Sequence, residues 1–131
     1  MNKTDAKTFD LNLDAESAVP IYDQIKNAIK MALFTGKLRE GDKLVSIRDV
    51  AAQHKINPIT ILKAYNQLEF EGFLQSRRGA GYFIHVDREK FKKGRKEMFE
   101  REVSQLLKRT ADLGYTVQDF LKELEKYVDN K

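Results

Sequence analysis

The length, composition and charge of this chain exclude several classes of protein. Its 131 residues suit one hydrophobic core with an appendage, and leave no room for a large catalytic or ligand-binding domain as well. With 24 lysines and arginines against 20 aspartates and glutamates, the net charge of +4 is compatible with nucleic-acid binding and equally with an ordinary charged surface. The chain has no cysteine, which excludes disulfides and thiolate metal sites. Without an apolar run long enough to span a bilayer or to form a signal peptide, we expect an intracellular, cytoplasmic protein.

Residues 1–18 are predicted to form a polar N-terminal arm. Phe9, Leu11 and Leu13 alternate at a period of two, which predicts a short strand or arm laid against the body. A frayed terminus is an equal alternative, because chain ends are often held by few contacts.

The first helix is predicted between Pro20 and Gly36, since proline suits a first helical turn and glycine ends a helix. Its apolar positions recur at helical spacing. They are Ile21, Tyr22, Ile25, Ala28, Ile29, Ala32 and Leu33. We expect this helix to form the floor of the domain, with Lys26 and Lys30 on its solvent side.

A turn, a brief strand and a second helix are predicted next. Residues 38–44 form the turn and the strand, which can pair with a hairpin further along the chain. Ser46 is a preferred N-cap, and Asp49 completes a capping-box pattern for a helix with Ile47, Val50 and Ala51 on one face. Residues 54–56 must then turn sharply.

A third helix is predicted to begin at Asn57 and Pro58, because asparagine is a preferred N-cap and proline a preferred first helical residue. Gly72 ends this helix. Its inward positions are Ile61, Ala64, Tyr65 and Leu68.

A hairpin follows the third helix. Strands are predicted at residues 73–77 and 82–84, joined by a turn at residues 78–81 that contains two glycines. Two short helices, a tight turn and a glycine-tipped hairpin together indicate a winged helix-turn-helix.

Residues 87–131 are predicted to form a tail of two amphipathic helices. Residues 87–96 are dense in charge, apolar residues recur at helical spacing from Phe99, and Gly114 ends that pattern. Thr116 with Asp119 then repeats the capping-box pattern. The candidate dimerisation residues on the two apolar stripes are Val103, Leu106, Leu107, Val117, Phe120, Leu121, Leu124 and Val128.

So short a tail cannot bury both stripes against each other, and we therefore expect a partner. The simplest partner is a second copy, which would give a two-fold homodimer. The alternative is that the stripes fold back on the chain's own winged domain.

Three segments resemble the DNA-binding domain of GntR-family bacterial transcription regulators, namely residues 41–51, 56–74 and 77–84. The short C-terminal remainder and the Asn-Pro turn look most like the small YtrA-like subgroup, which lacks a large effector domain. The resemblance implies a mainly α fold with a small β-hairpin. It assigns residues 1–18 to an arm, residues 19–86 to a winged helix-turn-helix DNA-binding domain, and residues 87–131 to a helical dimerisation tail.

The resemblance also implies a function, that of a sequence-specific transcriptional regulator. We expect a homodimeric repressor that binds a near-palindromic operator in double-stranded DNA. Half-sites would lie about 10 bp apart, or a multiple of that spacing, so that two helices enter successive major grooves. Any small-molecule effector would have to bind between the tail and the winged domain or at the dimer interface.

The outward face of the third helix supplies most candidate DNA contacts. Helical periodicity places Ile59, Lys63 and Asn66 outward, with Thr60, Leu62 and Gln67 on the flanks. Backbone amides at the helix N-terminus favour a phosphate, and Thr60 and Lys63 can bind phosphate or base edges. Asn57 can contribute unless it is used in capping its own helix. The full candidate set is Arg48, Asn57, Pro58, Ile59, Thr60, Lys63, Arg77, Arg78, Gly79 and Gly81.

Two further groups of residues complete this candidate surface. The resemblance implies a DNA contact for Arg48, whose alternative is a surface ion pair with Asp49 or Glu69. Arg77 and Arg78 flank the wing, whose glycines let the backbone approach a phosphate or enter the minor groove, although a plain solvated hairpin turn is the alternative. Ser46 is expected to serve as a cap and not as a DNA ligand.

Several positions depart from the family pattern. The family usually has glycine where Lys55 stands, and a non-glycine residue at positive φ is disfavoured. Many members carry arginine in place of Leu62, so a guanine contact cannot be carried over. Leu62 either touches a thymine methyl or lies exposed. Phe70 also falls on the outward face, with no role assigned to it.

Catalysis has little support in the sequence, and we expect neither an enzyme nor a cofactor or metal site. His54 and His85 are far apart and lack acidic residues at ligand spacing. No phosphate-binding glycine loop or nucleophile elbow is present. The competing hypothesis is a winged-helix module that binds protein or RNA, since a fold does not determine a function.

Overall fold

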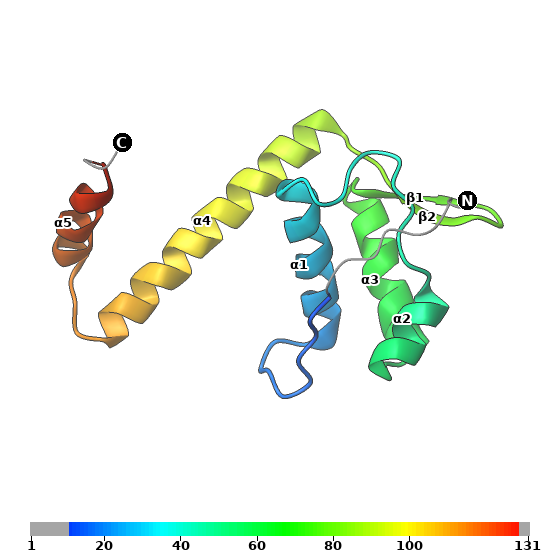
Figure 1. Cartoon of the computed structure of the whole chain (residues 1–131), viewed down its shortest axis with the longest axis horizontal. Coiled ribbons are helices and arrows are strands. Elements are labelled where there is room, and N and C mark those ends of the chain that lie inside the picture. Colours follow the sequence, from blue (N-terminus) through cyan, green and yellow to red (C-terminus); the bar gives the residue numbers. More distant parts are fainter. Residues whose placement is uncertain (1–10, 129–131) are drawn as a thin grey trace. The chain divides into compact units, whose positions relative to one another are not determined.

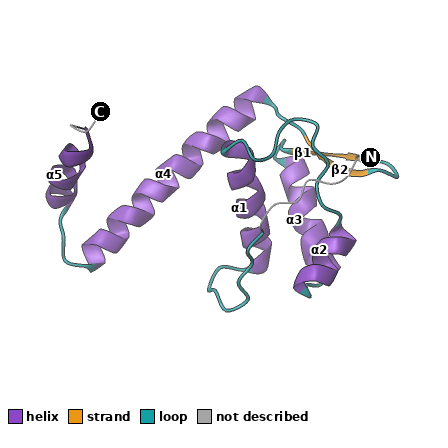
Figure 2. Cartoon of the chain, viewed as in Figure 1, coloured by secondary structure: helices purple, strands orange, loops and turns teal. Residues whose placement is uncertain are grey.

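The computed structural model describes residues 11–128, which form five helices and one antiparallel hairpin (Figures 1 and 2). In chain order these are α1 (Ile21–Phe34), α2 (Ile47–His54), α3 (Pro58–Phe70), β1 (Leu74–Arg77), β2 (Gly81–Ile84), α4 (Arg88–Asp112) and α5 (Val117–Val128). The mainly helical fold with a small hairpin agrees with the sequence prediction. The chain divides into two compact units, one ending at Lys92 and the other beginning at Lys93.

The first unit is built around α3. This helix packs against α1, α2 and β1, and Figure 1 shows it between the other two helices. Its inward residues are the four that the sequence predicted, and all are buried: Ile61, Ala64, Tyr65 and Leu68. Tyr65 donates a hydrogen bond from its hydroxyl to the carbonyl oxygen of Val45 at 2.7 Å. Burial raises the pKa of Tyr65 well above its ordinary value, so this hydroxyl remains a donor.

The helix ends of this unit confirm the predicted caps. Ser46 Oγ accepts a hydrogen bond from the backbone N–H of Asp49 at 3.1 Å, so Ser46 is the N-cap of α2. At the other end of α2, Lys55 has φ 56° and ψ 48°, which is the left-handed conformation. Where a helix ends in this conformation, the residue is usually glycine. The sharp turn between α2 and α3 is therefore made with a lysine in the left-handed region.

The hairpin pairs Leu74 with Ile84 and Arg77 with Gly81 in antiparallel register. A β-bridge between Lys43 and Phe83 adds the preceding segment to the edge of the hairpin, as predicted for residues 38–44. The backbone N–H of Leu44 donates to Tyr82 O at 2.8 Å within this pairing. The inner side chains of the sheet, including those of Leu74 and Ile84, complete the core.

The described part of the N-terminal arm, residues 11–18, packs on the core of the first unit without forming a strand. Leu11 is buried and Leu13 is half-buried against the core, whereas Phe9 lies outside the described residues. Gln24 holds this segment as a loop, because its side-chain amide donates to the carbonyl oxygens of Asp14 and Val19. These bonds satisfy backbone groups that a strand would otherwise have to pair.

One prediction about helical residues was wrong. Lys26 and Lys30 do not lie free on the solvent side of α1, because both form ion pairs with Glu71 and their side chains are only 15% and 20% exposed. The first tail helix begins at Arg88, inside the tail predicted for residues 87–131, so the charge-dense segment that precedes Phe99 is helical. Lysine, arginine and glutamate are good helix formers, and Asp87 Oδ1 accepts a hydrogen bond from the N–H of Lys90 at the start of α4.

The second unit comprises the later part of α4 and the whole of α5. Thr116 Oγ1 accepts from the N–H of Asp119, and Asp119 Oδ2 accepts from the N–H of Thr116, which is the predicted capping box with both bonds formed. These hydrogen bonds lower the pKa of Asp119. No helix in the described part of the chain combines the length and hydropathy needed to cross a bilayer.

Candidate nucleic-acid interface

The N-terminal end of α3 is organised by Asn57. Its Oδ1 accepts a hydrogen bond from the N–H of Ile59 at 2.9 Å, and Pro58 is the first residue of the helix. The capping role that the sequence left open for Asn57 is therefore the one its side-chain oxygen takes. Because amide groups in the first helical turn lack intrahelical partners, this end of α3 favours an anion electrostatically.

The outward face of α3 carries an unusual mixture of side chains. Ile59, Leu62 and Lys63 are exposed, with exposed fractions of 57% for Ile59 and 40% for Leu62, whereas Thr60 is half-buried. Leu62 thus lies exposed beside Lys63 and not at the edge of the core. Large aliphatic groups therefore share the exposed surface of this helix with a lysine.

Asn66 was predicted to be outward, and it is exposed, but it is bonded to the wing. Its Oδ1 accepts a hydrogen bond from the hydroxyl of Tyr82 at 2.6 Å. Burial, and to a lesser extent the nearby Glu69 carboxylate, raise the pKa of Tyr82, which keeps the phenol protonated as a donor. The Tyr82 ring also meets the Tyr65 ring edge to face, with centroids 5.2 Å apart.

A second link joins the same helix to the other strand of the hairpin. Glu69 Oε2 accepts hydrogen bonds from both the backbone N–H and the hydroxyl of Ser76, each at 2.9 Å. Helix α3 therefore holds the wing through both of its strands. Sequence reasoning missed both links, and the only available signal was the presence of polar residues in β1 and of tyrosine in β2.

Arg48 stands exposed on α2 and forms none of the ion pairs found within the described residues. Of its two alternative partners, Glu69 is hydrogen-bonded to Ser76 instead. Within residues 11–128, Arg48 thus has no carboxylate partner, which leaves its guanidinium accessible to a ligand of this surface.

The tip of the wing is open and basic. Arg77 stacks its guanidinium over the Phe83 ring, 4.1 Å from the centroid, while Arg78 is exposed in the turn. The turn is closed by a hydrogen bond from the N–H of Ala80 to Arg77 O, and it requires glycine at Gly79, where φ is +76°. Nothing lies within 4 Å of a side-chain carbon built at Gly79, so the backbone there is open to a close approach.

The C-terminal end of α3 is held by an ion cluster centred on Glu71. Lys26 and Lys30 of α1 approach its carboxylate oxygens at 2.8 and 2.7 Å, and Gln67 donates a third hydrogen bond at 2.9 Å. Burial by itself raises the pKa of Glu71, but the hydrogen bonds from Lys26, Lys30 and Gln67 outweigh it and hold the pKa at about 2. This cluster ties α3 to α1.

Within the second unit, apolar side chains remain uncovered along both helices. Of the candidate dimerisation residues on α4, Val103 and Leu106 are exposed and Leu107 is half-buried. Four of those on α5 are exposed, namely Val117, Leu121, Leu124 and Val128. The eighth, Phe120, is half-buried. A cleft of about 470 Å³ lies beside this surface, lined by Thr110, Leu113, Tyr115, Asp119, Phe120, Lys122, Glu123 and Lys126.

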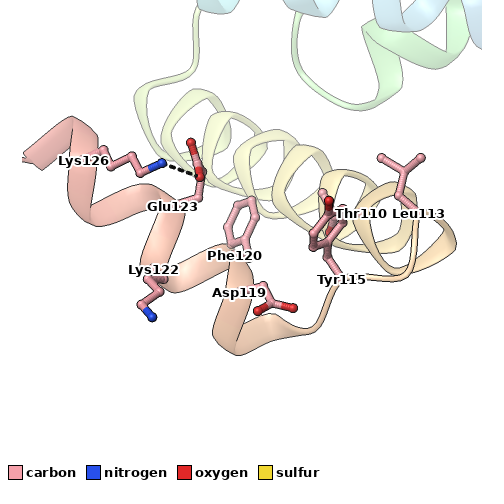
Figure 3. A pocket seen from close by; sticks show the side chains of 8 residues that line it. All are labelled: Thr110, Leu113, Tyr115, Asp119, Phe120, Lys122, Glu123 and Lys126. Atoms are coloured by element: carbon pink, nitrogen blue, oxygen red, sulfur yellow. Dashed lines mark ion pairs between the residues drawn. The ribbon is translucent and has the colours of Figure 1, made fainter.

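Figure 3 shows the Phe120 ring pointing from α5 toward α4 inside this cleft, with the Lys126–Glu123 ion pair at its rim. Charged side chains thus border an apolar floor. Such a surface, apolar at its centre and polar at its edge, is typical of protein interfaces.

The two histidines do not form a site. His54 is half-buried at the end of α2, and His85 Nδ1 lies 3.8 Å from Glu40 Oε2 on the surface. Within residues 11–128, no group of three or more histidine, aspartate and glutamate side chains is arranged to hold a metal ion.

Comparison with known proteins places this surface in context. Residues 21–84 match the family described as bacterial regulatory proteins, gntR family. The HTH-type transcriptional regulator YhcF of Bacillus subtilis is 35% identical over 115 residues, which are 87% of this chain and 94% of that protein. The HTH-type transcriptional repressor YtrA of the same organism is 35% identical over 98 residues, covering 74% of this chain and 75% of the repressor.

The solved structures agree with the sequence relatives. A GntR family transcriptional regulator from Listeria monocytogenes is similar with a TM-score of 0.70 and 27% identity, over 87% of this chain and 98% of that one. The similarity extends beyond the winged domain into the tail helices, because the aligned share of the chain exceeds the first unit alone.

Proposed function

The chain belongs to the GntR family of bacterial regulatory proteins, and on this premise we propose that it is a homodimeric transcriptional repressor of a near-palindromic operator. The observation that carries the proposal is the surface around α3. The amides at the start of this helix, an exposed lysine and an arginine-bearing wing belong to one linked unit. The RNA-binding or protein-interaction alternative is not favoured, since the relatives are named as transcription regulators and repressors.

The candidate residues take different parts in this proposal. Arg48, Lys63, Arg77 and Arg78 would contact phosphates, and Thr60 a phosphate or a base edge. The helix start at Asn57 and Pro58 would direct its amides at the backbone, and Gly79 and Gly81 would let the wing approach a groove. Ile59 is left to contact base edges.

We propose that the tail, residues 87–131, pairs with the tail of a second copy. The uncovered stripe on α5 supports this, because a surface of four exposed aliphatic side chains on one helix is costly to leave in water. A self-complementary patch produces a closed two-fold dimer, which matches the symmetry of a palindromic site. An effector, if the regulator responds to one, would bind at the cleft beside this stripe.

The proposed activity is binding without catalysis, in the cytoplasm, where bacterial DNA lies. Its mechanism is occupancy of the operator. Two recognition helices enter major grooves about 10 bp apart, or a multiple of this spacing, and each wing contacts the flanking backbone.

Selection of bound sequences from a random duplex pool, followed by fluorescence anisotropy across a salt series, tests the proposal. A regulator should recover one symmetric motif, and its log K should fall steeply and linearly with log salt. A scrambled duplex of the same length and composition is the control. Binding that ignores both sequence and salt would contradict the proposed function.

A further inference from the structure

The first two turns of α3 expose two large aliphatic side chains on one face. Ile59 and Leu62 are three residues apart, so they lie next to each other on the helix surface. Their exposed fractions of 57% and 40% contrast with the complete burial of Ile61 between them. Covering these two side chains would release apolar surface from water, so a partner at this point gains from touching them.

The polar side chains of the same helix are largely engaged within the protein. Asn57 Oδ1 caps the helix, Asn66 Oδ1 accepts from Tyr82, and Gln67 Nε2 donates to Glu71. An amide reads adenine by using its oxygen and nitrogen together, and the bond from Tyr82 already takes one acceptor position of the Asn66 oxygen. Lys63 and the half-buried Thr60 are the remaining polar groups near the exposed aliphatic pair.

The charges around the pair indicate which kind of partner covers it. Three cationic side chains are exposed: Arg48 on α2, Lys55 in the turn that follows it, and Lys63 on α3. A purely apolar protein partner would have to strip water from these cations, whereas DNA neutralises them with phosphates. A DNA duplex fits both the exposed cations and the exposed aliphatic pair, if its groove presents an apolar group between its phosphates.

We propose that Ile59 and Leu62 read the 5-methyl groups of thymine, so that each half-site carries A·T pairs at the two positions they face. The thymine methyl is the one apolar group that a base pair presents in the major groove. This inference rests on the proposed function and deepens it, since it assigns the class of base pair that α3 reads.

Replacing thymine by deoxyuridine in the selected operator tests this with the unmodified protein. The exchange removes only the methyl group and leaves base pairing and every hydrogen-bonding group in place. At each contacted position we expect affinity to fall about fourfold, the effect of one methyl-sized apolar group no longer buried. Thymines elsewhere in the duplex are the internal control and should tolerate the exchange.

Variants then assign the methyl groups to the two side chains. We call the factor by which deoxyuridine lowers the affinity the uracil penalty. In Leu62→Ala this factor should fall toward one at one position of the half-site, and in Ile59→Ala it should fall toward one at another position. Leu62→Arg should replace the thymine preference with a guanine preference, because arginine binds guanine in a bidentate manner. Met31→Ala is the matched control, since Met31 is 41% exposed on α1, and it should leave every uracil penalty unchanged.

The outcomes separate the two proposals. A selected motif without thymine in its half-sites, or equal binding of thymine and uracil operators, would overturn this inference while the proposed function stands. A uracil penalty that persists in both alanine variants would overturn it as well. Failure to recover any preferred duplex would overturn both.

Discussion

Glu71 adds an ion cluster to the packing of α3 against α1. Its carboxylate receives Lys26, Lys30 and Gln67, and its pKa in the folded protein is about 2, against an ordinary value near 4.5. The folded state therefore holds this group ionised at pH values where the unfolded chain has already taken up a proton. Stability from this cluster is fully present above about pH 4.5 and is lost as the pH falls toward 2.

We therefore expect Glu71→Gln to reduce the urea midpoint at pH 7 and to flatten the decline of stability between pH 5 and about 2. Urea denaturation at several pH values measures both effects. Glu123→Gln is the matched control, because Glu123 forms an ion pair with Lys126 on the exposed surface of α5. An unchanged pH dependence in Glu71→Gln would show that the cluster does not contribute as its geometry indicates.

Arg48 provides the test of one side chain that is proposed to bind DNA. We expect Arg48→Ala to weaken operator binding about tenfold, and to lower the salt slope by about 0.9 for each phosphate that is no longer neutralised. The reason is that its exposed guanidinium has no carboxylate partner among the described residues. Thr60→Ala should weaken binding less, through one hydrogen bond. Both variants should sediment as the wild type does.

The control for Arg48→Ala is Arg101→Ala, which removes the same charge from an exposed position of the second unit. Equal reductions of affinity in the two variants would mean that total charge, and not the position of Arg48, determines the affinity.

At the scale of elements, the turn between α2 and α3 is strained at one residue. Lys55 occupies the left-handed region at φ 56°, where a Cβ is unfavourable and glycine is not. We expect Lys55→Gly to stabilise the protein by roughly 0.5 to 1 kcal/mol, because the relief of strain exceeds the added entropy of the unfolded chain.

Thermal and urea denaturation measure this change. Ala52→Gly, in the exposed part of α2, should have the opposite sign and cost roughly 1 kcal/mol, as glycine does within a helix. If both substitutions destabilise the protein, the Lys55 side chain stabilises the folded state by more than the strain of its backbone costs.

The wing and α3 behave as one element, because Asn66 and Glu69 bind the two strands of the hairpin. These two links fix the orientation of the wing relative to α3.

Phe70, at the end of α3, is 81% exposed, and nothing in the structure explains it.

For the whole molecule, the proposed pairing of two tails would set how tightly the protein binds its operator. We expect Leu124→Asp to dissociate the homodimer and to weaken operator binding roughly a hundredfold or more, because a charge on the uncovered stripe of α5 prevents pairing and removes bivalency. Sedimentation and anisotropy measure the two effects separately.

Gln118→Asp is the control for Leu124→Asp, since it adds the same charge to an exposed residue of α5 away from the stripe. A monomeric wild-type protein, or a dimer that survives Leu124→Asp, would contradict the assignment of α5 to the interface.

The sequence alone determined the features that depend on near neighbours. The caps at Ser46 and Asn57, the inward face of α3, the hairpin and the capping box at Thr116 all follow from interactions within a few residues. Such interactions are present in the pattern itself, because helical periodicity and cap chemistry do not require the rest of the fold.

Only the tertiary structure decided which polar groups are occupied and which are free. Lys26 meets Glu71 across 45 residues, and Tyr82 meets Asn66 across 16, because packing of α1 and the hairpin on α3 brings them together. The same packing leaves Ile59, Leu62 and Arg48 exposed. A one-dimensional pattern assigns each side chain to a face, but its partner depends on which element covers that face, and burial of the common core determines this.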